Sequence, residues 1–109
     1  MCGITGFIEW NRDLTKESDL VLSMTSCLEK RGPDAQGTWI SGPCAFGHRR
    51  LSVMDPENGA QPMIIHEEDA VFTIVYNGEI YNALELKAEL QRRGRTFRTN
   101  CDTEVLLQS

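Results

Sequence analysis

The sequence predicts a small α+β domain built in layers, and three observations support this prediction. Two short apolar stretches, Gly37–Ile40 and Cys44–His48, are joined by Ser41-Gly42-Pro43 in the manner of antiparallel strands. The segments with helical spacing lie apart from these strands instead of alternating with them. The 109 residues, of which 40% are hydrophobic and 25% charged, suffice for one small globular domain.

The first predicted strand runs from Cys2 to Trp10, because its residues alternate between two faces. Its glycines weaken the strand or let another backbone or a ligand approach closely. A turn at Asn11-Arg12-Asp13 follows the strand. One face would carry Ile4, Gly6 and Ile8, and the other Thr5, Phe7 and Glu9.

A helix is predicted over Glu17–Lys30, where apolar side chains recur at helical spacing. Gly32-Pro33 ends this helix, because proline cannot continue it. The periodic positions are Leu20, Val21, Met24 and Leu28, with Cys27 beside them.

The second half of the chain begins with an irregular stretch, Leu51–Gln61, which contains proline and glycine. Val71–Tyr76 is nearly all apolar or β-branched and therefore predicts a strand. Asn82 is expected to cap a following helix, with Glu85 at capping-box spacing and Gly94 at the end of the helix.

The final segment, Asp102–Ser109, predicts the beginning of a helix with an acidic first turn. The helical pattern stops within two turns, and no turn residue closes it. We therefore expect residues 1–109, or 2–109 after removal of Met1, to be the front part of a longer domain.

The net charge of the chain and the pattern of its cysteines argue against several classes of function. The formal net charge of −5 and the sequence pI of about 4.9 argue against binding to nucleic acid or to a membrane surface. The sequence has no membrane-spanning stretch and no secretory signal, so we expect a cytoplasmic protein with reduced thiols. The four cysteines form no C-x-x-C pair, so no metal site is expected; they are Cys2, Cys27, Cys44 and Cys101.

Cys2 directly follows the initiator methionine, and this position suggests catalysis. The small side chain at position 2 favours removal of Met1, which would place a thiol and a free α-amine on one residue. An α-amine titrates near pH ~7.7–8.0 and can act as the general base for the thiol. The alternative is that Cys2 stands second in the chain without a catalytic role.

Tyr76-Asn77-Gly78 is a candidate oxyanion hole. The asparagine amide and the backbone N–H that follows it could both point at a developing negative charge. The alternative is a simple turn, because Asn-Gly after an apolar strand is a common hairpin signal. The expected helix cap at Asn82, in place of a returning strand, argues against a plain hairpin.

A site for an amino-acid substrate also needs groups that bind its α-carboxylate and α-ammonium. Arg50 follows a predicted strand and could bind a carboxylate through two hydrogen bonds, or it could be a solvated arginine, as the adjacent Arg49 also suggests. Asp102 could bind an ammonium group, cap the final helix, or do both. His48 and His66 are isolated in the pattern and are assigned no role.

Six short motifs are spread along the chain: Met-Cys-Gly-Ile at 1–4, Arg-Gly-Pro-Asp at 31–34, His-Arg-Arg-Leu-Ser-Val-Met-Asp at 48–55, Gly-Ala-Gln-Pro at 59–62, Tyr-Asn-Gly-Glu-Ile-Tyr-Asn at 76–82 and Asp-Thr-Glu at 102–104. Together they resemble the N-terminal glutaminase domain of the class II glutamine amidotransferases. Within that class the chain looks most like the glutamine-hydrolysing asparagine synthetases. Each motif alone is weak, but the ordered set is specific and covers the whole chain.

The resemblance implies a role for each candidate residue. Cys2 would attack the side-chain amide of glutamine, and Asn77 with the Gly78 amide would form the oxyanion hole. Arg50 would bind the carboxylate of the substrate and Asp102 its ammonium group. The loop and strand residues implied to line the pocket are Leu51, Ser52, Val53, Met54 and Glu79.

The resemblance also implies the N-terminal-nucleophile hydrolase fold, an αββα sandwich of which this chain would hold only the front half. Glutamine would be hydrolysed to glutamate and ammonia, which the parent enzyme would use for ATP-dependent amidation of aspartate to asparagine. No cofactor is expected in this chain, because MgATP would bind the synthetase domain of the same parent, which is absent from the sequence. Exposed sheet edges are compatible with a homodimer.

Two residues depart from the family pattern. Arg49 stands where relatives often have glutamate, and Cys101 where they often have serine. Two functional alternatives stay open from the sequence. The parent could amidate another acceptor, because the absent domain chooses it, or the chain could bind glutamine without turning it over.

Overall fold

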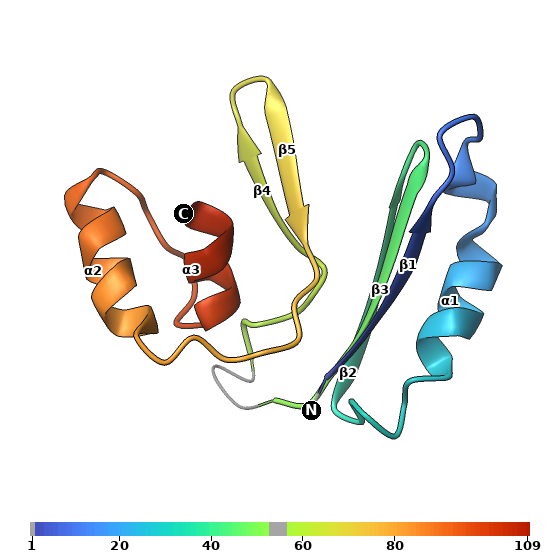
Figure 1. Cartoon of the computed structure of the whole chain (residues 1–109), viewed down its shortest axis with the longest axis horizontal. Coiled ribbons are helices and arrows are strands. Elements are labelled where there is room, and N and C mark those ends of the chain that lie inside the picture. The colour runs from blue at the N-terminus through green and yellow to red at the C-terminus, as the bar shows by residue number, and fades with distance from the viewer. Residues whose placement is uncertain (1, 53–56) are drawn as a thin grey trace.

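The structure is a computed structural model that describes residues 2–52 and 57–109. It confirms a mixed α and β domain, whose strands and helices gather in two halves (Figure 1). The first half contains β1 (Gly3–Ile8), the short 3₁₀ helix η1 (Leu14–Lys16), α1 (Ser18–Ser26), β2 (Ala35–Ser41) and β3 (Cys44–Arg50). The second half contains β4 (Met63–Glu67), β5 (Ala70–Ile74), α2 (Ala83–Arg92) and α3 (Asp102–Gln108).

The first half is built on an antiparallel three-stranded sheet in the order β1-β3-β2. The central strand β3 pairs with both neighbours, so that His48 lies opposite Ile4 of β1 and Gly37 of β2. Gly3 pairs with Arg49. This register brings Cys2 and Arg50 to the same end of the sheet.

One face of this sheet is covered by α1, and the other is open (Figure 1). The alternation predicted for β1 is confirmed, with its Thr5 and Phe7 face the more buried. The aliphatic side chains Ile4 and Ile8 lie on the open face, 48% and 51% exposed. The core beneath α1 consists of Leu14, Val21 and Ala45, with Phe7 and Ile40 packed against them.

The helix predicted over Glu17–Lys30 is shorter than expected and ends at Ser26. Turns replace it over 27–31, because the Leu28 carbonyl accepts the N–H groups of both Arg31 and Gly32. The chain can thereby bend back toward β2. A helical apolar pattern cannot reveal such a change, since the turn keeps a similar spacing of side chains.

The strand β4 is absent from the prediction, and β5 is shorter than expected. β4 pairs with β5 in an antiparallel hairpin in which Glu67 lies opposite Ala70. The turn between them is Glu68-Asp69, and Glu68 adopts a positive φ of 34°. Because neither residue is the asparagine or glycine typical of such turns, the sequence gives no hairpin signal here.

Two predicted helix caps form differently. Asn82 occupies the N-cap of α2 without a side-chain capping bond, so the predicted capping box with Glu85 is wrong. Cys101, and not Asp102, stands at the N-cap of α3. The Asp102 carboxylate is therefore available for other partners.

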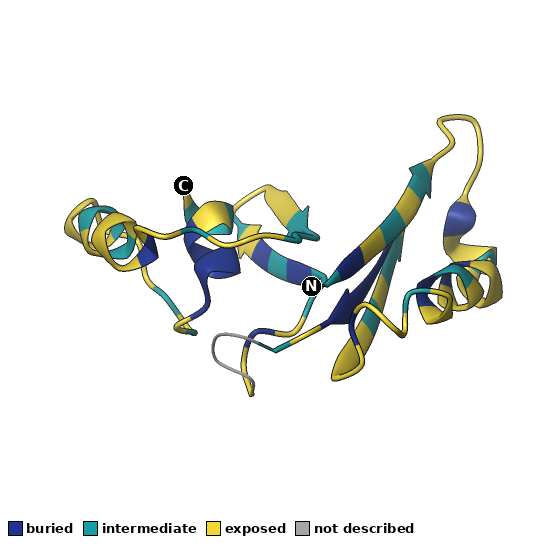
Figure 2. Cartoon of the chain, turned by 60° about the horizontal axis from the view of Figure 1, so that its bottom comes forward, coloured by how far each residue is buried: buried dark blue, intermediate teal, exposed yellow. Residues whose placement is uncertain are grey.

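The start of α3 is buried, from Asp102 to Val105 (Figure 2). The buried Glu104 carboxylate accepts hydrogen bonds from the N–H of Arg98 at 2.9 Å, from the N–H of Thr99 at 2.7 Å and from the Thr99 hydroxyl at 2.6 Å. Lys87 of α2 donates to the Thr99 carbonyl at 3.0 Å. These bonds fix the loop that leads to Asp102.

Candidate functional site

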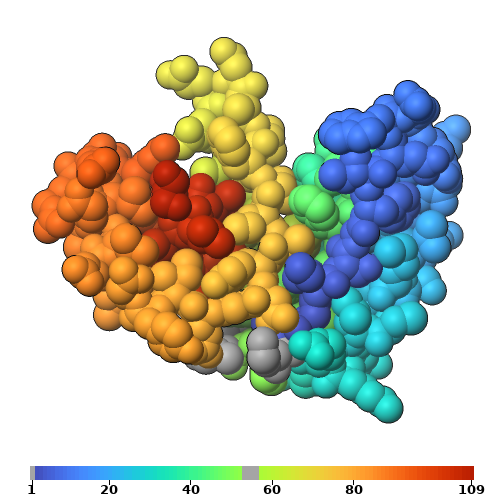
Figure 3. All heavy atoms as spheres, in the orientation of Figure 1, coloured from blue at the N-terminus to red at the C-terminus, as the bar shows by residue number. Residues whose placement is uncertain are grey.

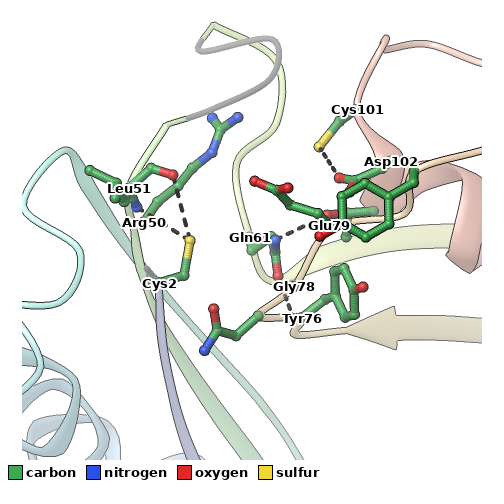
Figure 4. A pocket seen from close by; sticks show the side chains of 12 residues that line it. Cys2, Arg50, Leu51, Gln61, Tyr76, Gly78, Glu79, Cys101 and Asp102 are labelled. Atoms are coloured by element: carbon green, nitrogen blue, oxygen red, sulfur yellow. Dashed lines mark hydrogen bonds between the residues drawn. The ribbon is translucent and has the colours of Figure 1, made fainter. Parts of the chain in front are cut away.

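In the space-filling view a notch separates the upper parts of the two halves (Figure 3). A pocket of about 400 Å³ lies where the two halves meet (Figure 4). Segments far apart in the sequence supply its walls. The described residues that line it are Cys2, Arg50, Leu51, Gln61, Tyr76, Asn77, Gly78, Glu79, Tyr81, Cys101, Asp102 and Thr103.

The Cys2 thiol lies against the backbone of Leu51. The N–H of Leu51 donates to Cys2 Sγ at 3.3 Å, and the thiol lies 3.6 Å from the Leu51 carbonyl oxygen, to which it donates. Arg31 Nε also donates to the carbonyl of Cys2 at 3.3 Å. Cys2 is half-buried, and its sulfur has a backbone N–H donor.

Arg50 stands at the end of β3 on the same wall as Cys2 (Figure 4). Its side chain is buried, with 6% of the residue exposed. A Cβ placed at Gly59 would lie 2.1 Å from Arg50 Nη2, so a larger residue here would require the guanidinium to shift. The loop thereby holds a buried cation at the rim of the pocket.

The neighbouring Arg49 makes structural contacts instead. It donates from Nε to the Gly32 carbonyl and from Nη1 to Gln36 Oε1, both at 2.8 Å. Its Nη2 lies 3.8 Å from the Glu29 carboxylate. This departure from the family pattern therefore braces the turn after α1 and does not line the pocket.

The opposite wall is formed by the segment after β5 and by the start of α3 (Figure 4). Asn77 lies outside any helix or strand and Gly78 lies in a bend; no strand follows to pair with β5, so the hairpin interpretation of Asn-Gly is wrong. Asp102 Oδ2 accepts the N–H of Ile80 at 2.9 Å, and Oδ1 accepts the Cys101 thiol at 3.7 Å. Each oxygen keeps a further lone pair with which to accept a ligand.

The predicted loop residues divide into three groups. Leu51 and Glu79 line the pocket. Ser52 is not among the lining residues, and its N–H donates to Asp34 Oδ2 at 2.8 Å. Val53 and Met54 lie outside the described residues.

Sequence reasoning missed three lining residues, Gln61, Tyr81 and Thr103, together with the nearby His48. Gln61 could have been found from its place in the Gly-Ala-Gln-Pro motif, to which no role was attached. His48 could have been found from strand alternation, because it shares a face of β3 with Arg50. Tyr81 and Thr103 also lie in quoted motifs, at 76–82 and 102–104, in which they were given no role.

His48 is fully buried beside the pocket. Its burial lowers the pKa of the imidazole, the hydrogen bond to the Tyr76 carbonyl opposes this effect, and the nearby Arg50 charge lowers the pKa further. The ring is therefore neutral at neutral pH.

Two other kinds of site are absent from the described residues. Over 2–52 and 57–109, no three His, Cys, Asp or Glu side chains are grouped so that they could hold a metal ion. No helix in those ranges is both long and apolar enough to cross a membrane.

Comparison with known proteins shows the family to which the chain belongs. A family model described as the glutamine amidotransferase domain matches residues 1–109, the whole chain. The chain belongs to the glutamine amidotransferase domain family. The family resemblance read from the six motifs is thereby confirmed.

Curated relatives of this glutamine amidotransferase domain are much longer proteins. "Asparagine synthetase [glutamine-hydrolyzing] 3" of Bacillus subtilis (strain 168) is 46% identical over 109 residues, which are 100% of this chain and 18% of that protein. A second Bacillus subtilis protein, "Asparagine synthetase [glutamine-hydrolyzing] 1", is 42% identical over 98% of this chain and 17% of its own length. The asparagine synthetase of Sandersonia aurantiaca is 40% identical over 97% of this chain and 19% of its own length. The chain thus spans about a fifth of the length of these relatives.

Proposed function

We propose that this domain hydrolyses glutamine to glutamate and ammonia, with Cys2 as the nucleophile. The observation that carries the proposal is the single pocket that gathers a half-buried thiol, an Asn-Gly pair, a buried arginine and a buried aspartate from distant segments. Family membership supports the same reaction. These are the groups that an amide-hydrolysing site for an amino acid requires.

The proposed reaction begins after loss of Met1. The α-amine of Cys2 takes the thiol proton, and the sulfur attacks the side-chain carbonyl carbon of glutamine. The Asn77 amide and the Gly78 N–H stabilise the oxyanion that forms. When the tetrahedral intermediate collapses, the carbon–nitrogen bond breaks and the ammonium of Cys2 returns a proton to the departing ammonia. Water then hydrolyses the thioester to glutamate and restores the thiol.

Arg50 and Asp102 would select an α-amino acid. They lie on opposite walls of the pocket, a buried guanidinium on one side and a carboxylate on the other (Figure 4). The guanidinium would bind the substrate α-carboxylate, and the free lone pairs of Asp102 would accept the α-ammonium. Leu51 and Glu79 would line the space between them.

The longer relatives suggest the fate of the ammonia. Because their names are those of glutamine-hydrolysing asparagine synthetases, we propose that a synthetase domain of the parent protein uses the ammonia and MgATP to amidate aspartate. The open sheet face with Ile4 and Ile8 would be covered by further chain, completing an αββα sandwich. A cytoplasmic location and a homodimer stay predictions.

The test is Cys2→Ala in the full-length protein, with Cys27→Ala at an exposed thiol as the matched control. We expect Cys2→Ala to abolish glutamine hydrolysis while asparagine formation from free ammonia, aspartate and MgATP survives. Hydrolysis that persists in Cys2→Ala would show that another group is the nucleophile. If the wild-type protein hydrolyses glutamine but forms no asparagine, the acceptor is a different carboxylate.

A further inference from the structure

The backbone of Tyr76, directly before the Asn77-Gly78 pair, is held by side chains. The β4–β5 ladder ends where Met63 pairs with Ile74, so it does not reach Tyr76. The N–H of Tyr76 donates to Gln61 Oε1 at 2.6 Å, and its carbonyl lies 3.1 Å from His48 Nε2. Two side chains therefore bond the two polar backbone groups of one residue.

The His48 bond joins Tyr76 to the sheet that carries the nucleophile. A carbonyl oxygen only accepts hydrogen bonds, so Nε2 must carry the proton of the neutral ring and donate it. The other ring nitrogen, Nδ1, is buried without a partner among the described residues. His48 thus makes one directed bond, from a strand position opposite Ile4 and two residues before Arg50.

The Gln61 bond joins Tyr76 to the helix that carries Asp102. Gln61 Nε2 donates to Thr103 Oγ1 at 3.1 Å, next to Asp102 (Figure 4). The main chain of Gln61 also packs on β2, where a Cβ at Gly37 would lie 2.1 Å from the Gln61 carbonyl oxygen. Gln61 therefore contacts three parts of the molecule that must keep fixed positions around the pocket.

We propose that His48 and Gln61 are positioning residues that clamp the Tyr76 backbone and thereby place Asn77 and Gly78 relative to Cys2. This inference rests on the proposed glutaminase function. The oxyanion donors act mainly as negative charge develops on the substrate oxygen, so loosening them lowers kcat and leaves KM nearly unchanged.

The experiment uses the full-length protein with His48→Met and Gln61→Met, which remove the bonds and keep similar side-chain volumes. Each should lower the kcat of glutamine hydrolysis by about 10- to 100-fold and change KM by less than about threefold. His48→Gln can still present an N–H donor and should recover most of the lost kcat. The matched controls are His66→Met and Gln91→Met, both at exposed positions.

A second readout separates positioning from general loosening of the fold. An aldehyde analogue of glutamine adds the Cys2 thiol to form a hemithioacetal, whose oxygen occupies the oxyanion position. Its affinity should fall by the same factor as kcat in His48→Met and Gln61→Met. The rate at which Cys2 reacts with a pyridyl disulfide, a reaction without an oxyanion, should stay at the wild-type value.

Thr103→Val is a milder variant that removes only the anchor of Gln61 Nε2, and it serves if either methionine variant fails to fold. It should lower kcat and aldehyde affinity together, by a smaller factor than Gln61→Met. Wild-type kcat in the folded variants, or an equal loss of aldehyde affinity and disulfide reactivity, would overturn the proposed role of His48 and Gln61. The proposed glutaminase function would stand. A wild-type protein that does not turn over glutamine would overturn the proposed function and the clamp with it.

Discussion

The two halves of the molecule hold their parts of the pocket in different ways. In the first half, Cys2 and Arg50 are placed by the continuous β1–β3–β2 ladder over an apolar core. In the second half, the segment 76–80 and the start of α3 lie outside any ladder. Single side chains hold them, including those of Glu104 and Asp102.

This difference teaches that the two walls of one site respond differently to substitution. In a ladder many backbone hydrogen bonds together fix the position of each strand. One side-chain substitution in the first half should therefore displace Cys2 little. A buried carboxylate that accepts several hydrogen bonds leaves all of its donors unsatisfied when it is removed. The wall that would carry the oxyanion hole and the ammonium site is therefore the more sensitive one.

The largest effect is expected from Glu104→Ala. The variant leaves the N–H groups of Arg98 and Thr99 and the Thr99 hydroxyl without their buried acceptor. Local stability of the 98–105 segment should fall by about 3 kcal/mol, measured by hydrogen–deuterium exchange in the full-length protein. The KM for glutamine should rise, because Asp102 begins the same helix.

Amides of β1 and β3 provide the internal control for Glu104→Ala, since they belong to the other half. Their exchange should stay at the wild-type rate. Glu85→Ala, at an exposed position on α2, is the matched variant and should change neither region. Equal acceleration in both halves of Glu104→Ala would contradict the distinction drawn between them.

A smaller effect is expected from Gly59→Ala, which tests the wall built on the ladder. The added methyl group overlaps the Arg50 guanidinium and must displace it. Since the carboxylate of the substrate is bound in the ground state and in the transition state alike, KM should rise about tenfold with little change in kcat. Steady-state kinetics would measure this, with Ala60→Ser as the neighbouring control. A fall in kcat at unchanged KM would mean that Arg50 does not bind substrate as proposed.

The smallest effect is the pH dependence that His48 contributes. Its pKa in the folded protein lies below the ordinary value of about 6.5, chiefly because of burial. As the pH falls below about 6.5, the ordinary pKa of histidine, the unfolded chain takes up the proton first, and the free energy of unfolding decreases. Above it, the contribution of His48 is fully present. Denaturant midpoints at about pH 7.5 and about pH 5.5 should therefore differ less in His48→Gln than in the wild type. An equal difference in both proteins would show that His48 does not titrate in this way.

The sequence predicts the wall that carries Cys2 well, because the signals of this wall are local. Strand alternation in β1 follows from side-chain period alone, although the strand predicted over Cys2–Trp10 is longer than β1. The opposite wall is less predictable. Asn77-Gly78 has the local signature of a hairpin, and only the absence of a returning strand separates it from one. The turn of the β4–β5 hairpin, Glu68-Asp69, carries no such signature.

The hydrogen bonds that join the two walls could not be predicted from the sequence, although motif and strand position mark Gln61 and His48 themselves. His48 looks isolated in the chain, and the bond to Tyr76 exists only because the fold brings positions 28 residues apart together. Gln61 and Thr103, 42 residues apart, meet in the same way. Long-range hydrogen bonds depend on tertiary structure and leave no spacing in the sequence.

The central claim, that Cys2 is an N-terminal nucleophile, is tested most directly by intact mass and peptide mapping after exposure to a glutamine-like electrophile. The claim predicts that Met1 is lost, that one adduct forms on Cys2, and that excess glutamine prevents it. Retained Met1 without an adduct on Cys2, or modification of Cys101 in its place, would contradict it.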